Sequence, residues 1–346
     1  MAFWQQIGNR RLERDSGHID LSTSDRYISK EEAYGKYKHF LCDAGDFIIA
    51  SSGIKVEYVD KKMGFIDESM LPLCMNTSTI RFKVLDPKIL RIRYFMYYLK
   101  SWHFKAQLSQ HITGSAQLNY GPSHLKQMTM PLIQLKTQDE LIDRLDRIQN
   151  IIRLRNQELQ QLDELIKARF VELFGDPISN SKNLETKSLN EIMILKAGDF
   201  TAASAISDTL TETHRYPCYG GNGIRGFVAE YNQEGEYSLI GRQGALSGNV
   251  QYAKGRFKNT EHALLVTPKI QMNSIWLNQL LINLELKRFQ TGAAQPGLSV
   301  KNLQDIPIIT VSIEKQNRFA DFVAKIDKSK CDASNITSAT QYQLAS

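Results

Sequence analysis

The most regular hydrophobic pattern in the chain lies within Thr137–Phe174. Apolar residues recur there at alternating steps of four and three, which is the spacing of the seam of a coiled coil. The residues of this stripe, which we expect to form core or a partner interface, are Leu141, Leu145, Ile148, Ile152, Leu159, Leu162, Ile166 and Leu173. Gly175 and Pro177 predict the end of the helix. The pattern therefore predicts a long spacer helix over 137–175, between two globular bodies.

The chain also repeats one order of predicted elements. An aromatic-rich helix is expected over roughly 88–110, and a second helix over roughly 275–289. In both halves a T-G-x-A-Q sequence, a short apolar run, a glutamine and an amphipathic helix follow. Thr113–Gln117 matches Thr291–Gln295, and Gln138 matches Gln316. The apolar run of the first half, Leu125, Met128 and Met130, matches that of the second half, Leu303, Ile306 and Ile308. Upstream, residues 45–49 resemble 235–240 more loosely. Such a duplication predicts a pseudo-two-fold repeat and, for a binding protein, a bipartite target.

The globular parts are predicted to be mostly β, because short β-branched or aromatic runs alternate with Gly, Asn and Asp. The expected strands are Phe47–Ala50, Thr79–Val84, Phe227–Glu230, Tyr237–Ile240, Asn249–Tyr252 and Ala263–Val266. We therefore predict an α+β protein. Its expected parts are a domain over 1–136, the spacer helix over 137–175, a domain over 176–312, a second helix over 313–332 and an irregular tail over 333–346.

Composition narrows the class of protein without naming a function. The chain has 346 residues, enough for two domains, and a net charge of +6, which permits a polyanionic partner. Four widely spaced cysteines and the lack of clustered histidines predict no disulfide framework and no metal site. A charged N-terminal stretch and the absence of a long apolar run predict neither a signal peptide nor a membrane span. We expect a cytoplasmic protein.

The familiar catalytic motifs are absent or out of context. Gly221–Gly226 matches G-x-G-x-x-G, but the sequence after it predicts a strand, whereas a dinucleotide fingerprint opens a helix. There is no phosphate-binding loop of the G-x-x-x-x-G-K-[ST] type. His214 and His262 have no nucleophile at a signature spacing, so structural histidines are the favoured interpretation. We predict that the chain is not an enzyme and binds no cofactor itself.

A recognition surface is the remaining candidate for function. Arg, Gln and Asn read base edges by paired hydrogen bonds, and Lys and Arg also bind phosphates. The candidate DNA-binding residues of the second domain are Arg225, Arg242, Gln243, Asn249, Lys254, Arg256 and Lys258. We expect Arg242 and Gln243 to contact bases, and the cations to lie nearer phosphates. Weaker candidates in the first domain are Ser51, Ser52, Lys55 and Asn76.

These motifs resemble a known family. The stretches 219–227, 239–250 and 260–263, the T-G-x-A-Q sequence and the F-G-D-P helix end are similar to those of the specificity subunits of type I restriction–modification enzymes. The resemblance extends over most of the chain, and the order of domain, helix, domain and helix also fits. It implies that each domain is a target recognition domain that reads one half of a split duplex DNA sequence. It further implies antiparallel helices that dock methyltransferase (modification) subunits, which carry S-adenosylmethionine, and a restriction subunit that uses ATP and Mg²⁺.

The chain departs from that family pattern at two places. The first domain lacks a clear counterpart of the roughly forty residues from Lys182 to Gly221. After Lys330 the second helix loses its pattern, which predicts a truncated helix, an uncovered seam and possible self-association. The alternatives are therefore an inactive truncated specificity subunit, or a coiled-coil adaptor whose β-domains bind proteins.

Overall fold

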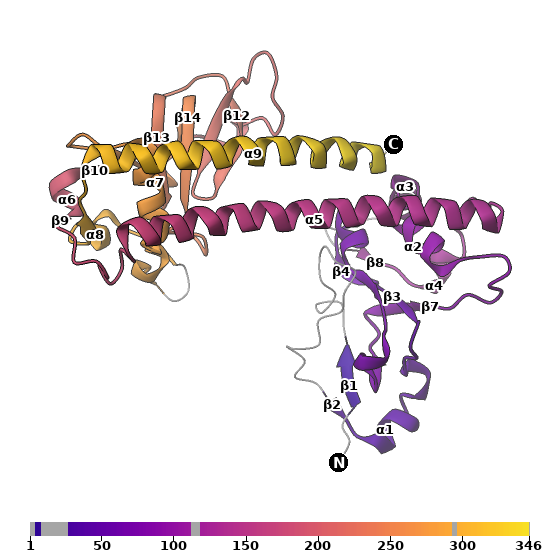
Figure 1. The fold of residues 1–346 in the computed structure, drawn as a ribbon. Helices are drawn as coiled ribbons and strands as arrows, with labels where there is room; N and C mark the ends of the chain where they lie inside the picture. Colours follow the sequence, from indigo (N-terminus) through magenta and orange to yellow (C-terminus); the bar gives the residue numbers. More distant parts are fainter. Residues whose placement is uncertain (1–3, 8–26, 112–117, 293–295, 346) are drawn as a thin grey trace. The chain divides into compact units, whose positions relative to one another are not determined.

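The computed structural model describes residues 4–7, 27–111, 118–292 and 296–345. The chain divides into two compact units. Unit 1 comprises Met1–Arg153 with Ser338–Ser346, and unit 2 comprises Leu154–Thr337. Helix α5 (Leu135–Phe174) is continuous over 40 residues and contributes to both units (Figure 1). Helices and strands both occur in each unit, which confirms the α+β class; where the domains begin and end stays a prediction.

Unit 1 contains small sheets followed by helices. Its strands are β1 (Trp4–Ile7), β2 (Tyr27–Ile28), β3 (Phe47–Ala50), β4 (Ser52–Ile54), β5 (Met63–Phe65), β6 (Leu73–Met75), β7 (Thr79–Phe82) and β8 (Leu118–Asn119). Its helices before α5 are α1 (Lys30–Tyr34), α2 (Ile92–Lys100), α3 (Trp102–His111) and α4 (Pro122–Leu125), with short 3-10 turns such as η3 (Val56–Lys61). The strands pair in the orders β2-β1-β6, β5-β3-β7 and β4-β8.

Unit 2 is built on a larger sheet with the order β10-β15-β13-β14-β11-β12. Its strands are β9 (Thr186–Ser188), β10 (Met193–Ala197), β11 (Tyr216–Gly220), β12 (Gly223–Val228), β13 (Gln233–Gly241), β14 (Val250–Asn259), β15 (Ala263–Pro268) and β16 (Pro307–Ile309). Its helices are α6 (Leu189–Ile192), α7 (Ser274–Asn283), the 3-10 turn η6 (Leu286–Phe289), α8 (Val300–Leu303) and α9 (Ile313–Ala345).

Both units contain the same three-stranded antiparallel motif. In unit 1, β3 lies between β5 and β7, and Ala50 pairs with Thr79. In unit 2, β13 lies between β14 and β15, and Gly241 pairs with Ala263. A helix follows the third strand in each case. The central strands are those for which the sequences 45–49 and 235–240 showed a loose similarity, so the duplication extends upstream of its gapless part.

A buried glutamine marks the start of the long helix in each unit. The Gln138 side-chain oxygen accepts the backbone N–H of Arg91, the N-cap of α2, at 2.9 Å. Gln316 accepts the backbone N–H of Asn273, the N-cap of α7, also at 2.9 Å. Their amide nitrogens donate to the backbone carbonyls of Ile133 and Val311, each two residues before the same long helix begins. The repeat therefore preserves a hydrogen-bonded junction as well as an order of elements.

The residue after each glutamine strengthens the same junction. Asp139 accepts two hydrogen bonds from the Arg91 guanidinium, at 2.8 and 3.1 Å. In unit 2 the corresponding contact joins the side chains of Asn273 and Asn317 at 2.9 Å. A charged pair and a neutral pair thus occupy equivalent positions.

The helix predicted over 88–110 is interrupted, which corrects that expectation. Ser101 has an extended backbone and separates α2 from α3. Its hydroxyl donates to the Tyr98 carbonyl at 2.7 Å and accepts the Phe104 N–H at 3.3 Å, so one side chain ends the first helix and caps the second. The helix predicted over 275–289 is likewise interrupted, because Glu285 takes a left-handed backbone conformation before η6.

The second long helix continues beyond Lys330, and the irregular tail predicted over 333–346 is wrong. Helix α9 extends over 33 residues to Ala345. Its last part has weak helix propensity, but it contains no Gly or Pro to end the helix. Within unit 2 the two long helices are antiparallel: Phe319 contacts Phe170, Phe322 lies beside Arg169, and Lys330 pairs with Asp163. This part of the expectation is confirmed.

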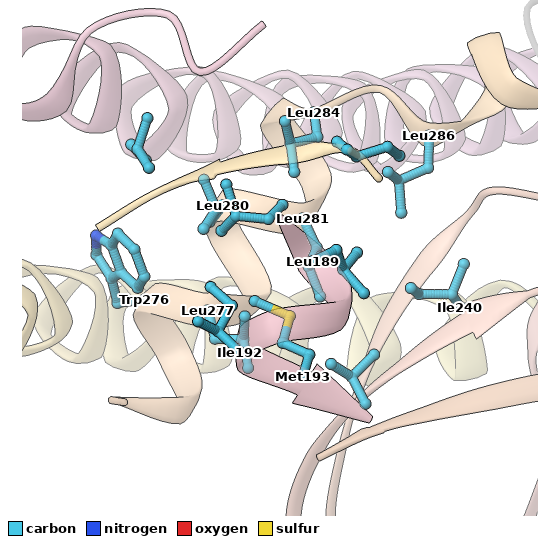
Figure 2. Packing of buried hydrophobic residues seen from close by; sticks show 14 of the residues in the cluster. Leu189, Ile192, Met193, Ile240, Trp276, Leu277, Leu280, Leu281, Leu284 and Leu286 are labelled. Carbon is cyan, nitrogen blue, oxygen red and sulfur yellow. The ribbon is translucent and has the colours of Figure 1, made fainter. Parts of the chain in front are cut away.

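The core of unit 2 includes the end of α5. Ile166, Phe170 and Phe174 are buried among residues of β10, β13, β15, α7 and α9. Figure 2 shows part of this cluster, which includes Trp276 and leucines of α7 and of the turn after it, together with Met193 of β10 and Ile240 of β13. Aromatic rings in edge-to-face contact join the two long helices here.

The predicted seam residues differ in burial along α5. Leu173 lies outside the buried face, with 39% of its surface exposed, because Phe170 and Phe174 take the inward positions at the helix end. Ile166 is buried in the core of unit 2. The remaining seam residues are half-buried: Leu141, Leu145, Ile148, Ile152, Leu159 and Leu162.

The glutamine junctions predict a specific loss of stability. Gln138→Leu or Gln316→Leu leaves a buried backbone N–H without an acceptor, which costs about 1–3 kcal/mol. We expect lower urea midpoints in circular-dichroism unfolding of both variants. Gln160→Leu, which changes an exposed glutamine of α5, serves as the control. Midpoints equal to that of the control would show that these hydrogen bonds do not hold the junctions.

Candidate nucleic-acid interface

The loop between β13 and β14 carries the two residues expected to contact bases. Its ends close on each other, since Gly248 N–H donates to Gly241 O at 2.7 Å and Gly241 N–H donates to Asn249 O at 2.8 Å. A Cβ on Gly248 would lie 2.6–2.9 Å from the backbone of Leu286 and Lys287, so this close packing requires glycine. On this constrained loop Gln243 is exposed and Arg242 is half-buried.

Three other segments of unit 2 meet this loop. The glycine-rich turn between β11 and β12 approaches so closely that a Cβ on Gly241 would lie 2.1 Å from the Gly221 oxygen. From the turn after β14, the His262 oxygen accepts the Arg242 N–H at 3.1 Å. From the segment that contains the second T-G-x-A-Q sequence, Leu298 N–H donates to the Arg242 oxygen at 2.8 Å. We call these four segments the loop cluster: 220–223, 241–249, 260–262, and 291–292 with 296–298.

The glycine motif is a β-turn element, as its context predicted. Strand β12 begins within it, and no helix follows. The stretch before it, from Tyr216, forms strand β11. It pairs with β12 on one side and, through Cys218 and Tyr219, with β14 on the other.

A chain of polar contacts runs through the cluster. The Gln243 side-chain oxygen lies 2.6 Å from Nδ1 of His262. Nε2 of the same ring lies 3.0 Å from a carboxylate oxygen of Glu261. The other oxygen of that carboxylate accepts the backbone N–H of Thr201 at 3.2 Å. The sequence favoured a structural histidine at His262, although its position three residues after the end of β14 was a usable signal.

The remaining predicted residues of unit 2 divide into two groups. Asn249 belongs to the cluster, and its amide donates to Asn222 at 3.1 Å. Arg225 is exposed on β12, next to the glycine turn. Asn222 was not among the predicted residues, because a polar residue between two glycines reads as ordinary turn sequence.

The three cations of β14 are paired with carboxylates. Lys254 pairs with Glu236 at 2.8 Å, Arg256 with Glu234 at 3.0 Å and Lys258 with Asp199 at 3.5 Å. The hydrogen bond from Lys254, with those from Tyr252 and Ser274, lowers the pKa of Glu236 to about 2. The first two pairs lie across from the start of β13, away from its loop. These cations therefore have partly compensated charges and are not gathered with Gln243.

Ser51 and Ser52 of unit 1 occupy the positions equivalent to Arg242 and Gln243. They directly follow central strand β3, as Arg242 and Gln243 follow β13. Ser52 pairs with Asn119, and Tyr120 N–H donates to the Ser51 oxygen at 3.0 Å. In unit 2, Gln243 pairs with Gly297, and Leu298 N–H donates to the Arg242 oxygen at 2.8 Å. Both central strands are thus followed by a loop bound to the segment after T-G-x-A-Q.

The unit 1 candidates differ in exposure. Ser51 is 4% exposed. Asn76 accepts hydrogen bonds from the N–H and hydroxyl of Ser78, so its side chain stabilises its own turn. Lys55 is exposed just before η3. The sequence Thr113–Gln117 lies outside the described residues.

Exposed apolar side chains accompany the loops of unit 2. Phe200 is 79% exposed, Ile224 55% and Leu246 42%. They lie next to Thr201, in the glycine-rich motif and in the loop after β13, respectively. Apolar side chains can contact the methyl group of thymine. The sequence signal for these three residues was a large apolar side chain within or beside a glycine-rich turn.

The described residues contain neither a membrane-spanning helix nor a cluster of metal ligands. No helix in that part of the chain combines the length and apolarity needed to cross a bilayer. Across the same residues, His, Cys, Asp and Glu nowhere form a group of three suited to hold a metal ion.

Curated relatives match part of the chain. It is 45% identical over 141 residues to the EcoprrI specificity subunit of the type I restriction enzyme of Escherichia coli, which is 41% of this chain and 35% of that protein. It is 29% identical over 138 residues to a putative type I restriction enzyme specificity subunit, S.HindORF215P, of Haemophilus influenzae, covering 39% and 35%. The matched stretches thus span about a third of these relatives.

Solved structures share the fold over nearly the whole chain. The S subunit of a type I restriction–modification system from M. genitalium matches with a TM-score of 0.54 and 18% identity, over 99% of this chain and 86% of that one. A chain from a structural study of complex assembly and conformational transition of the type I R-M system matches with a TM-score of 0.52 and 15% identity, over 99% and 88%.

The family profile described as type I restriction modification DNA specificity domain matches residues 9–164 and again 181–339. The two matches follow the duplication seen in the sequence and in the structure. Together they include most of the chain, and the chain therefore belongs to the type I restriction modification DNA specificity domain family.

Proposed function

We propose that this chain is the DNA sequence-recognition subunit of a type I restriction–modification complex and reads a bipartite duplex target. Each unit reads one half-site through the loop that follows its central strand. The observation that carries this proposal is the equivalence of Ser51–Ser52 and Arg242–Gln243. Repeated loops with different side chains suit two half-sites of different sequence.

The chemistry of the unit 2 loop cluster suits base reading more than phosphate binding. Gln243, Asn249 and Asn222 offer neutral donors and acceptors, and Arg242 adds a cation. Lys254, Arg256 and Lys258 already have carboxylate partners. Hydrogen bonds to base edges carry sequence information, whereas phosphate contacts mainly position the protein.

The long helices are proposed to dock the modification subunits. Half-buried apolar residues continue along α5, and Ile151, Leu154 and Leu165 are 43–49% exposed. Such a stripe is suited to a partner helix. In this proposal the partner subunits hold S-adenosylmethionine, ATP and Mg²⁺ in the cytoplasm, a restriction subunit joins for cleavage, and this chain supplies the address without catalysis.

Methylation mapping tests the assignment of half-sites. In cells that co-express the chain with a modification subunit, we expect plasmid DNA to be methylated at a split motif with two unlike halves. Gln243→Ala removes a base-reading side chain, so it should relax one half only, by about tenfold at one position. Ser52→Ala should affect the other half.

Lys254→Ala is the matched control, because Lys254 lies in the same unit but is paired with Glu236 away from the loop cluster. It should leave the motif unchanged. A motif that Gln243→Ala does not alter would contradict the role of this loop. A palindromic motif would indicate that one unit reads DNA and two chains pair, and absent methylation despite co-purification would indicate an inactive subunit.

Salt dependence separates DNA recognition from the adaptor alternative. Binding to duplex DNA releases counterions, so the logarithm of affinity should fall linearly with the logarithm of salt concentration. Fluorescence anisotropy of a labelled duplex, with the chain in its co-purified complex, measures this slope. Binding that does not depend on salt, or no binding to duplex, would favour a protein-binding adaptor.

A further inference from the structure

Two polar atoms of the His262 ring face acceptor atoms, which restricts its hydrogen-bonding states. Nδ1 lies 2.6 Å from the Gln243 side-chain oxygen and Nε2 lies 3.0 Å from a Glu261 oxygen. A neutral imidazole has one N–H, so it cannot donate to both oxygens. The contacts can be satisfied in two ways that differ by one proton and by the orientation of the Gln243 amide.

In the charged state, Nε2–H donates to Glu261 and Nδ1–H donates to the Gln243 oxygen. The amide nitrogen of Gln243 is then the end that faces away from His262, and it presents two donors. In the neutral state, Nδ1 gives its proton to solvent and becomes an acceptor. A half-turn of the Gln243 amide lets its NH₂ group donate to Nδ1, and the carbonyl oxygen is then the end that faces away.

The two states suit different bases. A donor pair fits the N7 and O6 acceptors of guanine or the O4 acceptor of thymine, whereas a carbonyl oxygen fits the amino groups of adenine and cytosine. Gln243 is exposed, so the end that faces away from His262 can reach a ligand. We propose that His262 is a positioning residue whose protonation selects the hydrogen-bonding face that Gln243 presents to DNA. This inference rests on the proposed function of the loop cluster.

The charged groups around His262 favour this arrangement. Glu261, next to it in the chain, places a carboxylate oxygen against Nε2 of the ring. Asp199, whose backbone oxygen accepts the Glu261 N–H, has its carboxylate bonded to Asn232 and Lys258. Arg242, on the adjacent loop, donates its backbone N–H to the His262 oxygen. Arg225 lies on β12, beyond the glycine-rich turn.

Histidine changes charge in the neutral range, so pH can be used to switch between the two states. The experiment selects sequences from a duplex library with randomised positions, using the full chain in its complex with modification subunits. Selection at about pH 6 and about pH 8.5 places histidine on either side of that range. For the unsubstituted chain we expect the preferred base at one position of one half-site to change by about tenfold in enrichment.

Two substitutions separate positioning from structural support. His262→Phe removes both hydrogen bonds, and His262→Gln keeps a bonding partner that does not titrate. Both should abolish the pH dependence at that position, and His262→Gln should retain a sharp preference for one base.

His214→Phe is the matched control, because His214 lies in the same unit and bonds to Thr211 and Thr213. It should keep the pH-dependent change of base. A base preference in the unsubstituted chain that is the same at both pH values, or a pH-dependent preference that persists in His262→Phe, would overturn the inference while leaving DNA recognition intact. Failure to retain any duplex at low salt would instead overturn the proposed function, and the inference with it.

Discussion

The hydrogen bond between a buried glutamine and the N-cap of an earlier helix, α2 or α7, is the interaction on which both halves of the chain depend. Gln138 and Gln316 each bind a part-buried backbone N–H that would otherwise lack this acceptor, and each also binds a carbonyl just before its own long helix. An unpaired buried N–H is costly, so the direction in which each long helix leaves its domain is strongly constrained. In each half, the loop after the central strand belongs to the domain from which the long helix leaves.

The repeat makes this constraint visible in the sequence, which is why the order of elements was predictable. Matching glutamines at matching positions lie in gapless segments, and short-range spacing was sufficient to find them. The equivalence of Ser51–Ser52 with Arg242–Gln243 was not predictable in this way. It follows from pairings of the central strands and loops with distant segments, and neither the loop lengths nor the side chains of the two units match there.

Other differences have local causes that sequence patterns do not resolve. Heptad spacing favoured Leu173, but packing against Trp276 and Phe319 places Phe174 inward instead. Low helix propensity suggested an end near Lys330, although propensity is a weak determinant where no Gly or Pro breaks a helix. The pairing of Lys254 with Glu236 depends on the register of β13 against β14, which the sequence pattern does not show.

The central strands and the loops after them have different roles: the strands are fixed in the core, whereas the side chains of the loops can differ. Residues such as Ile49 and Ile240 on the central strands are buried and tied to the domain core. The residues that follow them are held by backbone hydrogen bonds, at Ser51 and Arg242 alike, so their side chains can differ without loss of those bonds. A loop fixed through its backbone leaves side-chain chemistry free to vary. In unit 2, His262 from a neighbouring segment contacts this loop in two ways. Its side chain contacts the side chain of Gln243, which can vary, and its backbone oxygen accepts the backbone N–H of Arg242.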